Sequence, residues 1–301
     1  RGGNGSHRAQ RAALTPRAFA PANAAGATAV SSSSNEERLI AAARAGDLKR
    51  LVLAVAESGN VHCKTSRGQN LLMLAASSSS ETTLDAVKFL LEALASMEVR
   101  DQAGWNALHH ACRNSNAGAV RLFVERKALL NSCTNDGETA LILAAMDGQL
   151  EMLTLLLGMK AGVTKRDRSG KTALYHVSER GNHELVKLLL RHGAKTNVKA
   201  IDSTTPIMMA LKHDKTKVVQ MLLARTADIN VQDSHGESVF MYCLRSGNQQ
   251  MIDHLMEKSA DLDLENHNGK TALLIARTLG MNNAADTIAK RMGIILNAIK
   301  D

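Results

Sequence analysis

One eight-residue phrase recurs along this 301-residue chain at a fixed spacing. It reads GWNALHHA from Gly104, GETALILA from Gly137, GKTALYHV from Gly170 and GKTALLIA from Gly269. Degenerate copies begin at Ser203 and Gly236, so that consecutive copies from 104 to 269 stand 33 residues apart, and two earlier copies begin at Asn35 and Gly68. A period of this length predicts a stack of eight small, similar units in place of one compact core.

Each unit carries the signals of two short helices. The third residue of the phrase can accept a hydrogen bond from the first turn of a helix, which predicts a helix start; these residues are Asn70, Asn106, Thr139, Thr172, Thr205, Ser238 and Thr271. A turn residue ends this first helix; these are Gly148, Gly181, Asp214, Gly247 and Gly280. An amphipathic segment with two adjacent apolar residues, such as Leu156 and Leu157, follows as the second helix. With only 3 prolines and 2% aromatic residues, the chain favours an all-α fold of thin layers.

These phrases resemble the ankyrin repeat. Leu108-His109 and Thr205-Pro206 keep parts of the family's Thr-Pro-Leu-His motif, and the segment from Asp228 to Gly236 is similar to its hairpin. The resemblance implies an all-α solenoid of helix-turn-helix units with short hairpin loops, a concave face that binds other proteins, and no catalysis. The predicted units lie near 35–67, 68–103, 104–136, 137–169, 170–202, 203–235, 236–268 and 269–301.

The two ends of the chain carry separate expectations. Residues 1–34 form a basic, Ala- and Ser-rich segment without acidic residues, which predicts a disordered tail and leaves a transit-peptide remnant as the alternative. The polar first unit suits a terminal cap. Ile294, Ile295, Leu296 and Ile299 lie past the normal end of the last helix, where they form either a longer cap or a seam for another chain or a ninth repeat. We expect a monomer unless this apolar helix pairs.

A departure from the ankyrin pattern concerns the residue after the second helix. The family often places Gly there, and Gly193 matches, whereas Lys127, Lys160, Thr226 and Ser259 occupy the position in other units. In left-handed geometry each of these residues would cost about 1 kcal/mol. We therefore expect an array less stable than an idealised one.

Charge and motifs narrow the classes of function. Four arginines of the tail supply +4 of the net charge of +8, so the other +4 is spread over the repeats and forms no basic stripe for nucleic acid. The four cysteines show neither metal-ligand nor disulfide spacing, no phosphate-binding or nucleophile motif occurs, and no apolar stretch is long enough to span a membrane. His109, His110 and Cys112 are interpreted as structural helix residues, and Asp261, Asp263, Glu265 and His267 as a hairpin. We expect no enzyme activity, metal or cofactor.

A partner-binding surface is predicted around the turn glycines and the ends of the first helices. Trp105, the only tryptophan, follows a turn glycine at a position that holds polar residues in other units, so we expect it to be exposed and to anchor a partner. The alternative is that Trp105 packs on an adjacent hairpin and supports the stack. The predicted binding residues are Trp105, Arg113, Asp136, Glu138, Asp147, Arg168, Lys171, Arg180, Lys212 and Arg245. They predict a cytoplasmic scaffold or adaptor for another protein. The alternative is the ankyrin adaptor portion of a larger enzyme, channel or ligase.

Overall fold

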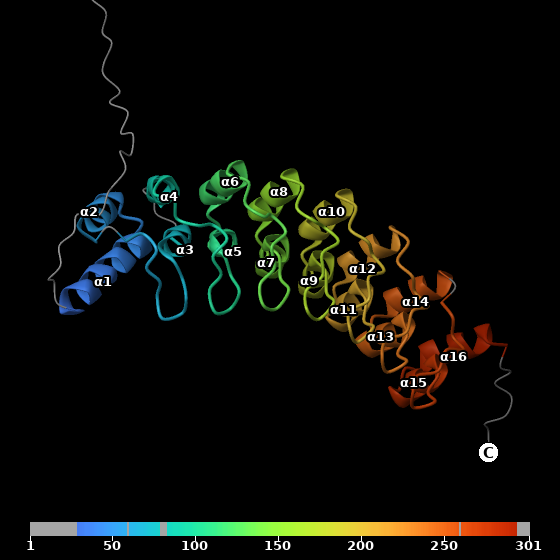
Figure 1. The fold of residues 1–301 in the computed structure, drawn as a ribbon. Coiled ribbons are helices and arrows are strands. Elements are labelled where there is room, and N and C mark those ends of the chain that lie inside the picture. Colours follow the sequence, from blue (N-terminus) through green and yellow to red (C-terminus); the bar gives the residue numbers. More distant parts are fainter. Residues whose placement is uncertain (1–28, 59, 79–82, 259, 294–301) are drawn as a thin grey trace, which may run out of the picture.

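The computed structural model describes residues 29–58, 60–78, 83–258 and 260–293, and within them the fold is sixteen helices without a strand. The helices come in eight pairs, one for each predicted unit (Figure 1). In chain order they are α1 (Ala29–Ala45), α2 (Leu48–Ser58), α3 (Leu71–Ala76), α4 (Thr83–Glu92), α5 (Ala107–Arg113), α6 (Ala117–Glu125), α7 (Ala140–Asp147) and α8 (Leu150–Gly158). The other eight are α9 (Ala173–Arg180), α10 (His183–Arg191), α11 (Pro206–Lys212), α12 (Thr216–Leu223), α13 (Val239–Ser246), α14 (Gln249–Glu257), α15 (Ala272–Thr278) and α16 (Asn282–Arg291).

The predicted capping residues start the first helices of their units. In six units the side chain accepts from the backbone N–H three residues later, as with Asn106 and the N–H of His109 at 3.1 Å. Thr205 also stands at the N-cap, but its hydroxyl makes no capping bond and is buried without a partner among the described residues. The pattern that predicts the helix starts is therefore confirmed, with one cap that lacks its hydrogen bond.

Left-handed residues end the helices where the sequence predicts them. Gly148 and Gly181 close α7 and α9 with φ of 74° and 84°. Lys127, Lys160 and Thr226 have φ of 62°, 63° and 57° after the second helices of their units, whereas Ser259 lies outside the described residues. The expected strain of about 1 kcal/mol each thus applies to these three side chains.

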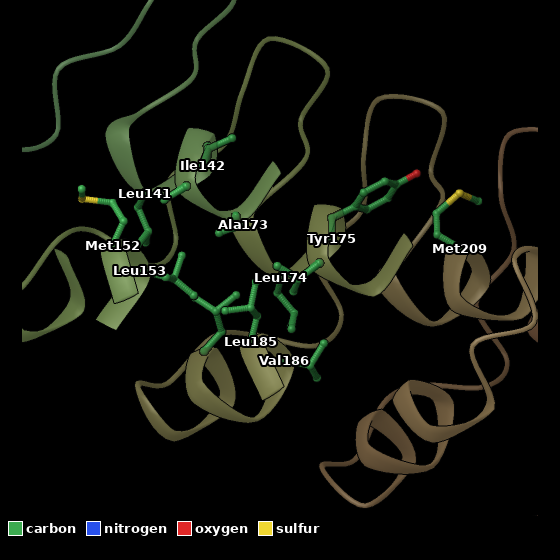
Figure 2. Close-up of a cluster of buried hydrophobic side chains, with 14 of the residues drawn as sticks. Leu141, Ile142, Met152, Leu153, Ala173, Leu174, Tyr175, Leu185, Val186 and Met209 are labelled. Carbon is green, nitrogen blue, oxygen red and sulfur yellow. The ribbon is translucent and has the colours of Figure 1, made fainter. Parts of the chain in front are cut away.

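The core is a continuous layer between neighbouring helix pairs. The small residues of the first helices are at most 1% exposed, which lets adjacent pairs approach closely; they are Ala75, Ala111, Ala144, Ala210, Cys243 and Ala276. In Figure 2, Leu174 of α9 points toward Leu153 of α8 and Leu185 of α10, and all three are at most 1% exposed. Tyr175 points away from this cluster toward Met209 of the next unit.

The N-terminal boundary differs from the prediction. Helix α1 begins at Ala29, not near Asn35, so the backbone of the serine run 31–34 is helical. Extending an existing helix fixes one residue per added hydrogen bond and needs no new nucleus, so a polar run can continue it. Residues 1–28 of the predicted tail and the apolar residues from Ile294 to Ile299 lie outside the described residues.

The stack is arched. Figure 1 shows the even-numbered helices along its outer side and the odd-numbered helices with the hairpin loops along its inner side. We call the surface formed by the hairpins and the odd-numbered helices the concave face. None of the helices in the described part of the chain is long and apolar enough to cross a membrane.

Candidate protein-binding surface

A ladder of backbone hydrogen bonds joins the tips of successive hairpins. One N–H at each tip donates to a carbonyl of the hairpin before it, at 2.7–3.0 Å. The donor–acceptor pairs are Gln102–Arg67, Asn135–Ala103, Arg168–Asp136, Ile201–Ser169, Ser234–Asp202 and His267–His235. Because the hairpins are held at fixed spacing, side chains on them form a preorganised surface.

Trp105 is half-buried, not exposed as the sequence predicts. Its ring centroid lies 5.4 Å from that of His110 and 6.3 Å from that of His109, both in its own unit. Its backbone N–H donates to the Asp101 carboxylate at 2.9 Å. One part of the indole therefore packs on the two histidines, and the remainder faces solvent on the concave face.

Two predicted arginines are engaged within the molecule. Arg113, at the end of α5, pairs with Asp147, at the end of α7, at 2.9 Å. Arg245 pairs with Glu237 at 2.8 Å, and Asn266 donates to the same carboxylate at 2.7 Å. Burial alone would raise the pKa of Glu237, but these hydrogen bonds outweigh it and lower the pKa below its usual value. The first ion pair joins two residues that the sequence predicts as separate contacts for a partner, and the second joins the predicted Arg245 to a carboxylate outside the predicted set.

Lys171 lies over an aromatic ring of its own unit. Its ammonium group is 4.8 Å from the centre of the Tyr175 ring, a cation–π distance. The Tyr175 hydroxyl is 2.7 Å from the Thr204 hydroxyl, which in turn donates to Asp202 at 2.6 Å. Burial would raise the pKa of Asp202, yet its bonds from Thr204 and the nearby Lys171 lower it overall.

The remaining predicted binding residues differ in whether their side chains are hydrogen-bonded within the molecule. Glu138 accepts a hydrogen bond from Thr134 at 3.2 Å. The exposed side chains of Asp136, Arg168, Arg180 and Lys212 make no hydrogen bond or ion pair within the described parts of the chain. Among the predicted acidic residues, only Asp147 is neutralised by an ion pair, so the charges of Asp136 and Glu138 stand beside those of the unpaired Arg168, Arg180 and Lys212.

A polar contact that the sequence-based prediction did not include repeats every second unit. A hairpin Asp accepts from a residue on the first helix of its unit, in the pairs Asp101–His110 at 2.9 Å, Asp167–His176 at 2.8 Å and Asp233–Tyr242 at 2.8 Å. The intervening units place Thr134 with Leu143, Ala200 with Met209 and Asn266 with Ile275 at the same positions. Comparing units two apart instead of adjacent ones would have found these pairs.

The side chains of His109, Cys112 and Cys243 are buried in the helix packing. His109 is buried, its Nδ1 accepts from the Asn106 N–H, and its Nε2 lies 2.9 Å from the Ser132 carbonyl oxygen. Burial lowers its pKa to about 4. Burial also raises the pKa of the Cys112 and Cys243 thiols to about 12. No group of three or more His, Cys, Asp or Glu side chains that could hold a metal occurs in the part of the chain that the structure describes.

Comparison with known proteins agrees with this architecture. The sequence profile described as "Ankyrin repeats (3 copies)" matches residues 38–125, 78–167 and 159–233. No curated protein matches the chain. Beyond residue 233, helices α13 to α16 continue the same pairing of a capped first helix with a second helix. Since the matches cover more than half of the chain, and the repeat phrases, caps and hairpins all agree with them, the protein belongs to the ankyrin repeat family.

Proposed function

We propose that this protein is a scaffold or adaptor that binds a segment of another protein along its concave face. The observation that carries the proposal is the set of unpaired charges at Asp136, Arg168, Arg180 and Lys212 on hairpins and helix ends that the backbone ladder holds at fixed spacing. Charges on a preorganised surface fix the register of a partner and speed its association.

Trp105 supplies the apolar anchor of the proposed surface. A tryptophan that is part buried and part exposed offers contact area without a large loss of side-chain entropy, and such residues are frequent binding hot spots. Arg113, Asp147 and Arg245 are already paired, so we assign them the role of shaping the surface. We assign the same role to Lys171 and Glu138, whose side chains also interact within the molecule. The four cysteines are unpaired, and we propose the cytoplasm as the location.

The test uses the immobilised chain and three variants. Trp105→Ala and Arg180→Glu change the concave face, and Lys187→Glu makes the same charge change on an exposed residue of α10, on the outer side. A true partner is captured by the wild type and by Lys187→Glu but not by the two concave-face variants.

The purified partner then gives the magnitudes. We expect Trp105→Ala to weaken its affinity roughly tenfold or more with little change in melting temperature. Arg180→Glu should slow association, and the difference should shrink at high salt. A drop of several degrees in the melting temperature of Trp105→Ala, or an unchanged affinity, would contradict the proposed surface.

A further inference from the structure

A cavity of about 530 Å³ opens on the concave face near its N-terminal end. It lies between the last turn of α1, the first hairpin and the end of α3. Its polar lining consists of Arg44, Thr65, Ser66, Arg67, Gln69 and Ser77. Arg44 near the end of α1 and Arg67 in the first hairpin are 23 positions apart in the sequence, and the fold places both on the wall of this one cavity.

The charge of this cavity is uncompensated. Arg44 and Arg67 are both exposed, and neither guanidinium makes a hydrogen bond or ion pair within the described ranges. No carboxylate lines the cavity. By contrast, Arg113 and Arg245 farther along the same face are each neutralised by a carboxylate within 2.9 Å. The two arginines thus present two positive charges to whatever enters.

The other polar groups add mainly donors. The Thr65 hydroxyl oxygen accepts from the Gln69 N–H at 3.2 Å, which leaves its proton to donate. The Ser77 hydroxyl donates to the Met73 carbonyl at 2.8 Å, which holds it in place at the cavity wall. The Ser66 hydroxyl and the Gln69 side-chain amide have no partner within the described residues. A cavity rich in donors and without a carboxylate selects an anion with several acceptor oxygens.

We propose that this cavity binds the phosphate group of a phosphorylated serine or threonine in a partner protein. A phosphate monoester carries close to two negative charges near neutral pH, matching the two arginines, whereas a carboxylate carries one. Its oxygens suit the planar fork of a guanidinium, which binds phosphate through two parallel bonds. The proposal rests on the proposed function of the concave face and names the chemistry that this end of it recognises.

Contacts between the cavity and the next unit indicate the direction in which a bound phosphopeptide runs along the concave face. The Ser77 hydroxyl lies 3.4 Å from Nδ1 of His110, and the His110 ring packs against Trp105. The phosphate cavity and the exposed part of Trp105 are therefore neighbouring sites on the concave face. A peptide with its phosphate between Arg44 and Arg67 runs toward Trp105 and lays a flanking apolar side chain on the indole.

The experiment measures binding of the full 301-residue chain to fluorescent peptide libraries by anisotropy. One library has a central phosphoserine with random flanking residues, and its twin has serine at the same place. We expect the phosphorylated library to bind at least tenfold more tightly, and inorganic phosphate to compete with it. The double variant Arg44→Ala, Arg67→Ala should remove this preference while its circular dichroism spectrum is unchanged.

A second cavity supplies the matched control. It has a volume of about 420 Å³, lies beside the loop after α10, and also contains two basic residues, Lys195 and Arg225. The double variant Lys195→Ala, Arg225→Ala removes the same charge and should leave phosphopeptide binding unchanged. An equal loss of phosphopeptide affinity in both double variants would show that the effect comes from net charge alone, and would overturn the proposal.

Other outcomes separate this site from the proposed function. Equal binding of the two libraries, or tighter binding to vesicles that contain phosphoinositides than to the phosphopeptides, overturns the phosphoserine site. If the concave-face variants Trp105→Ala and Arg180→Glu still abolish capture of a partner protein in that case, the scaffold function stands without the phosphate cavity.

Discussion

At the scale of single residues, the turn glycines are fixed by two separate constraints. Gly137 has φ of 79°, and a Cβ added to it would lie 2.7 Å from the backbone nitrogen of Arg168 in the next hairpin. Gly148 has φ of 74° at the end of α7, and no atom lies within 4 Å of its added Cβ. The hairpin ladder creates the first contact, because it brings the following backbone against the turn.

We expect Gly137→Ala to destabilise the protein far more than Gly148→Ala. The second change costs only the left-handed strain of a side chain, about 1 kcal/mol. The first adds a clash with backbone that cannot rotate away, and should cost about 3 kcal/mol or more. Urea unfolding of the two variants checks the difference. Equal losses would mean that the next hairpin shifts freely, and that the ladder holds the units only loosely.

At the scale of the elements, the polar contacts recur every two units although the apolar phrase recurs every unit. Arg100, Arg166 and Gln232 each reach from one hairpin to the carbonyl of their own turn glycine and to a carbonyl of the next hairpin. Asn116, Asn182 and Asn248 cap the second helices of alternate units, whereas Gln149, Lys215 and Met281 at the intervening positions make no side-chain cap. Arg100, Arg166 and Gln232 therefore each couple their own unit to the unit that follows it.

Arg166 tests whether these bridging side chains stabilise the stack. It donates to the Gly170 carbonyl at 2.9 Å and to the Lys199 carbonyl at 2.5 Å. We expect Arg166→Met, which keeps the length of the apolar stem, to lower the free energy of unfolding by about 1 kcal/mol, since the exposed side chain is partly screened by water. Lys199→Met changes the equivalent residue one unit later and should have almost no effect in the same thermal or urea experiment. An equal loss of stability in the two variants would show that the Arg166 bridge does not stabilise the stack.

The sequence predicts what is decided within a unit and misses what is decided between units. The capping residues and the left-handed Lys127, Lys160 and Thr226 follow from local backbone chemistry and a fixed period, and the structure confirms them. The Arg113–Asp147 pair and the Arg44–Arg67 cavity depend on how far side chains reach across units, which no spacing specifies. Trp105 is half-buried because its ring packs against His110 of α5, and the comparison of adjacent units hid that contact.

At the scale of the whole molecule, the stack has no single centre. Helices of one unit pack on those of the next, as α7 does on α9 and α9 on α11, so the ends of the arch are linked only through the units between them. In such an array stability is close to a sum of unit and interface contributions. A weakened interface in the middle therefore divides the array, whereas the same change at one end only frays it.

Leu174 and Leu273 stand at equivalent positions of a central unit and of the last described unit, and are 1% and 8% exposed. Each change to Ala leaves a cavity and should cost about 2–5 kcal/mol locally. We expect Leu174→Ala to separate unfolding into two transitions, with hydrogen exchange no longer matched between the segments before and after α9. Leu273→Ala should speed exchange in α15 and α16 and leave the central helices protected. One cooperative transition in Leu174→Ala, with exchange still matched across the whole array, would show that coupling between units exceeds the stability lost at one of them.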